Sequence, residues 1–149
     1  MMITGIGHIA FRVTNLQRAL DFYCNKLGFS EAFRLELEGQ PSPWIVYIQI
    51  APGAFIELFP DSQSAPGTIP GRDSQASYKH VCLLVDDMSA TLSELAARGS
   101  EIAKAPTVGL DHNLQYWIDD PDGNPIELMQ IMPDSPQAVA DTRIQIRRR

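Results

Sequence analysis

The chain contains little cysteine, few basic residues and no long apolar run, and each shortage excludes a class of protein. Its two cysteines, Cys24 and Cys82, form no Cys-x-x-Cys motif, so we expect reduced thiols and a cytoplasmic location. The 12 Lys and Arg residues against 18 Asp and Glu give a net charge of −6, which argues against nucleic-acid binding. No apolar run approaches the roughly 20 residues of a membrane helix, and the first residues lack the apolar core of a signal peptide. We therefore predict a chain that binds neither nucleic acid nor membrane.

The sequence does contain an internal repeat with a period of about 70 residues. Each copy begins with a short apolar segment that carries one histidine, His8 in the first and His80 in the second, 72 positions apart. Each copy ends with an Ile-Glu-Leu segment, and the glutamates Glu57 and Glu127 are 70 positions apart. A fixed period that repeats residue types able to bind a metal predicts two related halves that share a site.

Both copies also predict the same order of elements, namely a strand, a helix and three further strands. The first helix is expected to begin with a capping box at Thr14 and to stop at Gly28. The second is expected to begin at Asp86 or Asp87 and to stop at Gly99. The expected strands cover residues 4–13, 32–37, 44–50 and 55–59 in the first copy, and 78–85, 101–103, 114–118 and 125–131 in the second.

These elements predict an α+β fold made of two βαβββ modules, residues 1–62 and 78–132. An isolated module of about 55 residues would leave one face of its sheet in water, so the two must pack together as one domain, residues 1–132. The linker, residues 63–77, is rich in Ser, Pro, Gly and Gln. The tail, residues 133–149, has little periodicity and ends in three arginines, so we expect a solvated end.

The four repeated residues have the pattern expected of a metal site. On a strand alternate side chains share a face, so Glu57 and Glu127 point away from their apolar neighbours. A carboxylate aimed into a sheet interior is costly unless it is paired or bound to a metal. Two His and two Glu suit Zn²⁺, Ni²⁺, Co²⁺, Mn²⁺ or Fe²⁺, and in octahedral geometry they leave positions open for water or substrate oxygens. His8, Glu57, His80 and Glu127 are therefore the predicted metal ligands.

These motifs resemble the vicinal oxygen chelate superfamily, which includes glyoxalases, bleomycin resistance proteins and extradiol dioxygenases. The resemblance is greatest to the glyoxalase I (lactoylglutathione lyase) family and extends over about residues 4–131. It rests on the segments Gly7-His8-Ile9, Asp21-Phe22-Tyr23, Leu27-Gly28-Phe29, Phe55-Ile56-Glu57-Leu58, His80-Val81 and Asp120-Pro121-Asp122-Gly123-Asn124-Pro125-Ile126-Glu127-Leu128.

The resemblance implies a cupped mixed sheet around one divalent metal, often in a homodimer whose site is in some members completed across the interface. The ligands of glyoxalase I align with His8, Glu57, His80 and Glu127, with Ni²⁺ or Zn²⁺ as the first candidates. The implied reaction converts the hemithioacetal of a 2-oxoaldehyde such as methylglyoxal and a thiol into a 2-hydroxyacyl thioester, through a metal-stabilised enediolate. One metal glutamate is the base that moves the proton. We take Glu127 first, and Glu57 remains open.

Arg12 shares its predicted strand face with His8, where a guanidinium can clamp a substrate carboxylate. The glyoxalase I family has a glutathione-binding arginine at this offset, which makes Arg12 a substrate-binding residue and the substrate a thiol adduct or anionic metabolite. Two features depart from the family. Asp61 stands where the glutathione-binding form has asparagine, which adds a negative charge unfavourable to glutathione. The loop at residues 109–113, with His112, is particular to this chain.

Other members of the superfamily define the alternatives. Methylmalonyl-CoA epimerases move a proton beside a metal-bound carbonyl, but they often carry glutamine where Glu57 stands. Fe(II) extradiol dioxygenases use two histidines and one carboxylate, so a fourth ligand counts against them. Bleomycin resistance proteins bind drugs on the same fold and generally lack the metal ligands. Metal content separates this last class from the enzymes.

Overall fold

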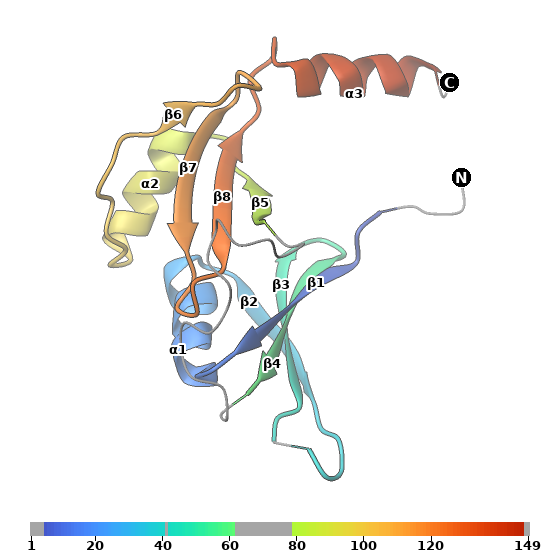
Figure 1. The fold of residues 1–149 in the computed structure, drawn as a ribbon, viewed down its shortest axis with the longest axis vertical. Helices are drawn as coiled ribbons and strands as arrows, with labels where there is room; N and C mark the ends of the chain where they lie inside the picture. The colour runs from blue at the N-terminus through green and yellow to red at the C-terminus, as the bar shows by residue number, and fades with distance from the viewer. Residues whose placement is uncertain (1–4, 41, 62–78, 148–149) are drawn as a thin grey trace. The chain divides into compact units, whose positions relative to one another are not determined.

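The computed structural model describes residues 5–40, 42–61 and 79–147, with side chains as far as Arg143. The chain folds into two compact units, residues 1–71 with 120–123 and residues 72–119 with 124–149. Each unit contains one four-stranded mixed sheet and its own helices (Figure 1). The predicted linker, residues 63–77, lies outside the described residues.

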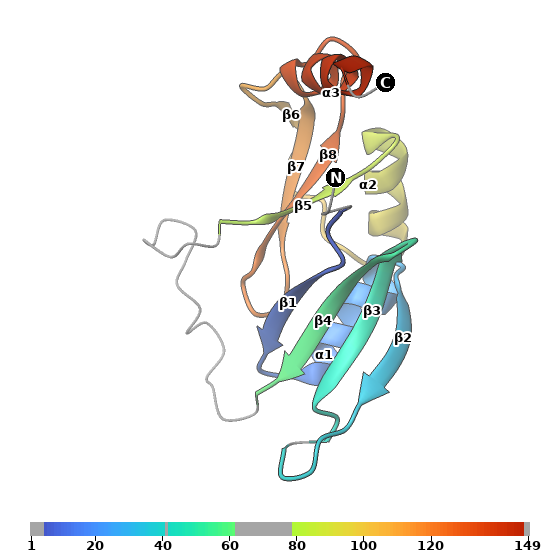
Figure 2. The same ribbon diagram turned by 90° about the vertical axis from the view of Figure 1, so that its right-hand side faces the viewer.

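The first unit is a βαβββ module. Its elements are β1 (His8–Val13), α1 (Leu16–Leu20), the π-helical continuation η1 (Asp21–Lys26), β2 (Ser30–Leu35), β3 (Ile45–Ala51) and β4 (Ala54–Pro60). The strand order is β1-β4-β3-β2, with β1 parallel to β4 and the other neighbours antiparallel. The helical segment covers one face of the sheet (Figure 2). Tyr23 of η1 and Ile48, Ile56 and Leu58 of the strands are completely buried, so they form the core of this unit.

The turn at residues 120–123 belongs to the first unit because its carboxylates bond to that unit. Asp120 Oδ2 accepts a hydrogen bond from the buried Tyr23 hydroxyl at 2.8 Å. Asp122 Oδ1 accepts one from the backbone N–H of Thr14 at 3.2 Å and another from the Thr14 hydroxyl. The two aspartates of the Asp-Pro-Asp-Gly motif therefore satisfy buried polar groups and have a structural role.

The second unit is also a βαβββ module, followed by a further helix. Its elements are β5 (Val81–Leu84), α2 (Met88–Ala97), β6 (Thr107–Val108), β7 (Leu114–Asp119), β8 (Pro125–Gln130) and α3 (Pro136–Arg147). The strand order is β5-β8-β7-β6, with β5 parallel to β8. Met88 and Leu92 of α2 are buried, as are Ile126 and Leu128 of β8, so they form the core of this unit. Across the described ranges, no helix has the length and apolar character that a membrane span requires.

The predicted α+β class and the two βαβββ modules are confirmed. Gly28 and Gly99 have φ angles of +77° and +83°, so both helices stop at a left-handed residue as predicted. Asp87 caps α2, because its side chain accepts a hydrogen bond from the backbone N–H of Ala90 at 2.8 Å. Cys24 and Cys82 are both free cysteines.

The predicted capping residue of the first helix is wrong. The structure places Asn15 at the cap, where its side chain accepts a hydrogen bond from the backbone N–H of Arg18 at 2.9 Å. Thr14 does not cap the helix because its hydroxyl and its backbone N–H both bond to Asp122. A contact more than 100 residues away in the sequence thus overrides a local capping motif.

The predicted strand at residues 101–103 is also wrong, since β6 lies at Thr107–Val108. Thr107 pairs with Gln115 and Val108 with Leu114, so the short loop that joins β6 to β7 determines where the strand lies. The tail, expected to be a solvated end, contains α3. The Ser135 hydroxyl accepts a hydrogen bond from the backbone N–H of Ala138 at 3.2 Å at the start of this helix.

Candidate functional site

The first unit brings together His8 and Glu57. They lie on the adjacent parallel strands β1 and β4, in which Glu57 is paired with Ala10. The distance from His8 Nε2 to Glu57 Oε1 is 3.6 Å. The side chain of Glu57 is 8% exposed and that of His8 is 52% exposed, so a buried carboxylate faces an accessible imidazole.

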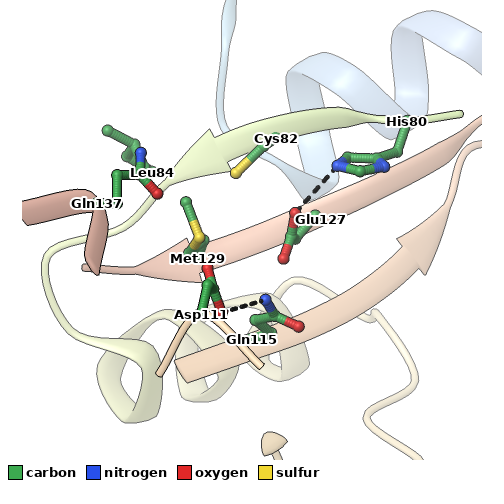
Figure 3. A pocket seen from close by; sticks show the side chains of 8 residues that line it. All are labelled: His80, Cys82, Leu84, Asp111, Gln115, Glu127, Met129 and Gln137. Atoms are coloured by element: carbon green, nitrogen blue, oxygen red, sulfur yellow. Dashed lines mark hydrogen bonds and ion pairs between the residues drawn. The ribbon is translucent and has the colours of Figure 1, made fainter. Parts of the chain in front are cut away.

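The second unit brings together His80 and Glu127 in the same way (Figure 3). His80 directly precedes β5, and Glu127 lies on the neighbouring strand β8. The distance from His80 Nε2 to Glu127 Oε2 is 3.1 Å, and the Glu127 side chain is 7% exposed. The two halves therefore each present one buried carboxylate beside one imidazole nitrogen.

An aromatic residue on the neighbouring strand is the cross-strand partner of each glutamate. Tyr47 of β3 is paired with Glu57, and Trp117 of β7 is paired with Glu127. The Tyr47 ring packs edge-on to His8 with ring centroids 6.3 Å apart, and the Trp117 ring packs edge-on to His80 at 4.9 Å. A hydrogen bond to Glu57 raises the pKa of Tyr47, so the phenol is a donor to that carboxylate. Sequence reasoning missed both residues, although each stands ten positions before its glutamate.

Cys82 is a third residue that sequence reasoning did not place at the site. It is paired with Glu127 across β5 and β8, in the position that Ala10 holds in the first unit. Burial raises the pKa of the Cys82 thiol to about 12, and the charge of Glu127 and a hydrogen bond to it act in the same direction. The thiol is therefore protonated at neutral pH and is not a nucleophile there.

The second unit contains a pocket of about 460 Å³ that includes His80 and Glu127 (Figure 3). This volume is within the range typical of small-molecule sites. The pocket extends from the His80–Glu127 pair across β5 and β8 to the loop before β7 and to α3. Its other lining residues are Cys82, Leu84, Asp111, Gln115, Met129 and Gln137.

The loop before β7 is held by a network around Asn113, which is completely buried. Asn113 Nδ2 donates to Asp111 Oδ2 at 2.7 Å and to Gln137 Oε1 at 3.3 Å. Asn113 Oδ1 accepts from the backbone N–H of Met132 at 2.9 Å. One side chain thus connects the loop to the segment after β8 and to α3. His112 of this loop has a φ of +64° and does not line the pocket.

Arg12, the predicted substrate-binding residue, lies on β1 and forms an ion pair with Asp61. Its Nη1 donates to Asp61 Oδ2 at 2.8 Å, and the Arg12 side chain is 71% exposed. The aspartate that departs from the family pattern is therefore the partner of this arginine. The arginine end of the pair is open to solvent, whereas the Asp61 side chain is 20% exposed.

The four predicted ligands are thus described as two pairs, His8 with Glu57 and His80 with Glu127. Within either unit, the described residues include no group of three or more His, Cys, Asp or Glu side chains arranged to hold a metal ion. Each unit offers part of a ligand set, with a buried carboxylate and an imidazole nitrogen of the kind that divalent metals accept.

Comparison with known proteins gives one consistent family. Residues 5–128 match the glyoxalase/bleomycin resistance protein/dioxygenase superfamily. The chain is 30% identical over 128 residues to the uncharacterized protein YaeR of Escherichia coli strain K12, covering 84% of this chain and 95% of that protein. It is 28% identical over 130 residues to a probable lactoylglutathione lyase of Synechocystis, covering 83% and 92%. Its fold matches that of a glyoxalase family protein from Enterococcus faecalis with a TM-score of 0.71 at 23% identity, covering 87% and 99%.

Proposed function

Because this chain belongs to the glyoxalase/bleomycin resistance protein/dioxygenase superfamily, we propose that it is a metal-dependent lyase of the glyoxalase I type. Its substrate would be the hemithioacetal that a 2-oxoaldehyde such as methylglyoxal forms with a thiol, and its product a 2-hydroxyacyl thioester. The observation that carries the proposal is the repeated pairing of a buried glutamate with a histidine, in His8–Glu57 and His80–Glu127.

The residues present fit a divalent metal. Glu57 and Glu127 are each paired with a histidine, and both side chains are less than a tenth exposed. A buried carboxylate without a cation is costly, and a metal ion would remove that cost. We propose that His8, Glu57, His80 and Glu127 together bind one ion, with Ni²⁺ or Zn²⁺ as first candidates and Co²⁺, Mn²⁺ or Fe²⁺ as alternatives. When bound, it would act as a Lewis acid toward the substrate oxygens.

The chain's own residues would carry the proton. We assign proton transfer to Glu127, which lines the pocket of about 460 Å³ and can therefore meet the substrate. Its carboxylate would take the proton from one substrate carbon and return it to the adjacent carbon, which converts the hemithioacetal into the thioester. Glu57 is the alternative base, but its hydrogen bond from Tyr47 favours a fixed carboxylate. Arg12 is proposed to contact the substrate.

We also propose that the protein is a homodimer in the cytoplasm. Two His–Glu pairs of the same construction suit a homodimer, because the ligands of one metal can then come from one chain or from both. The two free cysteines favour a reducing compartment, which we take to be the cytoplasm. The partner is a small molecule, and no nucleic acid or membrane is expected.

The test combines metal analysis with a rate measurement on the purified protein. The protein is loaded with Ni²⁺ or Zn²⁺ and mixed with methylglyoxal and one of two thiols, glutathione or 3-mercaptopropionamide. About one metal per pair of His–Glu sites and metal-dependent thioester formation would support the proposal. Glu127→Gln serves as the inactive control. Metal binding without thioester formation would redirect the assignment to an epimerase or a dioxygenase of the same superfamily, and failure to bind metal would favour a drug-binding protein.

A further inference from the structure

The pocket of the second unit carries negative charge, and one of its two carboxylates, Asp111, has no lysine or arginine beside it among the described lining residues. It is lined by two carboxylates, Asp111 and Glu127, and by two carboxamides, Gln115 and Gln137. Of the described residues that line it, none is a lysine or an arginine. In the proposed function Glu127 binds the metal, which offsets its charge. Asp111 at the other end keeps its charge.

Among the described residues, the donors that bond to the carboxylate of Asp111 are neutral. Its Oδ1 accepts from the Asn113 backbone N–H at 3.3 Å and from Gln115 Nε2 at 3.1 Å, and its Oδ2 accepts from Asn113 Nδ2 at 2.7 Å. These bonds fix the orientation of the carboxylate without neutralising it. A fixed negative charge at the wall of a pocket repels a second carboxylate and attracts N–H and O–H groups.

This wall of the pocket is closely packed. A Cβ at Gly109 would lie 2.3 Å from Gln115 Nε2 and 2.5 Å from Asp111 Oδ1, so these two side chains occupy the space that any other residue at 109 would need. The carboxamide of Gln137 comes from the first turn of α3, and Asn113 Nδ2 donates to it at 3.3 Å. Helix α3 lies after residue 128, where the match to the superfamily ends.

We propose that the Asp111 end of this pocket is a subsite for a part of the substrate that donates hydrogen bonds and carries no negative charge. Asp111 and the carbonyl of Gln115 would accept from that group, and the amide of Gln137 would donate to it. Met129 and Leu84 supply the apolar surface between this end and the His80–Glu127 pair. This inference rests on the proposed function, since the substrate it describes is a thioester or its hemithioacetal precursor. It selects a thiol with an amide or hydroxyl end over one with a carboxylate.

Two isosteric probes test the subsite, the S-lactoyl thioesters of 3-mercaptopropionamide and of 3-mercaptopropionate. They differ only in an amide or a carboxylate at the far end. Their binding to the full-length, zinc-loaded protein is measured by isothermal titration calorimetry at moderate salt. We expect the amide to bind at least about fivefold tighter than the carboxylate, and Asp111→Asn to reduce this ratio to below about twofold.

A second variant tests the same charge argument without changing the loop. Gln137→Lys adds a cation at the pocket edge and should strengthen binding of the carboxylate thioester by at least about fivefold. The matched control is Val139→Lys, which adds the same charge to the same helix at an exposed residue that does not line the pocket. It should change binding of either probe by less than about twofold.

Equal or tighter binding of the carboxylate thioester by the unmodified protein would overturn the subsite, as would failure of both thioesters to bind. An unchanged preference in both Asp111→Asn and Gln137→Lys would also overturn it. Turnover of the two hemithioacetals is measured separately. Binding with the expected preference but no turnover of either supports the subsite and contradicts the proposed function. Turnover of both hemithioacetals without a binding preference supports the proposed function and contradicts the subsite.

Discussion

Asn113→Ala should destabilise the protein through three bonds that one buried side chain makes. The Asn113 side chain is completely enclosed, and it is joined to the loop before β7, to the segment after β8 and to α3. Alanine removes all three side-chain hydrogen bonds. It leaves the backbone bond from Gly109 N–H to the Asn113 carbonyl, 2.9 Å long, in place. The effect therefore reports the side-chain network rather than the fold of the loop backbone.

The three bonds contribute unequally to the loss of stability. The Met132 N–H, 2.9 Å from Asn113 Oδ1, would lose its acceptor, which costs about 1–2 kcal/mol for a partly buried donor. The 2.7 Å bond to the Asp111 carboxylate adds about 1 kcal/mol. The 3.3 Å bond to Gln137 is long and contributes least. We expect the free energy of unfolding to fall by about 2–3 kcal/mol in total.

Urea denaturation followed by circular dichroism measures this change as a lower midpoint at unchanged slope. Gln137→Ala is the matched control, because it removes only the 3.3 Å bond and should cost less than about 0.5 kcal/mol. Hydrogen exchange gives a local readout, since the Met132 amide should exchange faster in Asn113→Ala than in the control. Equal destabilisation by the two variants, or an unchanged Met132 exchange rate, would refute the assignment of Asn113 as the link between loop and helix.

Four further predictions concern the site itself. Glu57→Gln and Glu127→Gln should each lower turnover at least about a hundredfold while leaving the urea midpoint nearly unchanged, and a full rate in both variants would contradict the proposed function. Arg12→Ala should raise the KM for an anionic substrate. Asp61→Asn removes the ion-pair partner of Arg12 and should lower that KM. Steady-state kinetics with a carboxylate-bearing thiol measure both changes. With a pKa raised to about 12, Cys82 should react with iodoacetamide at pH 8 at least about tenfold more slowly than free cysteine, and its rate should rise with pH up to that value. The same raised pKa means that the folded state favours the thiol, so the stability Cys82 contributes is present below pH 9 and is lost as the pH rises from 9 toward 12.

The sequence predicts the fold well where periodicity and glycine stops agree. The repeat correctly predicts two βαβββ modules, and the stops at Gly28 and Gly99 lie where left-handed residues end both helices. Elements that depend on distant contacts are missed. The place of β6 follows from its pairing with β7, and the N-cap of α1 follows from the competition of Asp122 for Thr14. Neither contact leaves a local signal in the sequence.

In the candidate site too, the sequence predicts the residues that spacing repeats and misses those that distant contacts bring together. Spacing alone singles out the four His and Glu residues, and their joint role as ligands of one metal stays a prediction. Tyr47 and Trp117 each stand ten positions before a glutamate, but the cross-strand register is what shows that they lie against it. The sequence also does not predict the Asp111 end of the pocket. Gln137 reaches it from α3, and the weak periodicity of that segment did not predict a helix.

The two halves are related but unequal, and the inequality bears on which glutamate moves the proton. Glu57 faces a phenol that donates to it, whereas Glu127 faces the Cys82 thiol, a weaker donor. A carboxylate held by a stronger hydrogen bond is less free to leave a metal and accept a proton. Glu127 also lines the pocket that can admit a substrate. Under the proposed function, both differences favour Glu57 as a fixed ligand and Glu127 as the carboxylate that moves the proton.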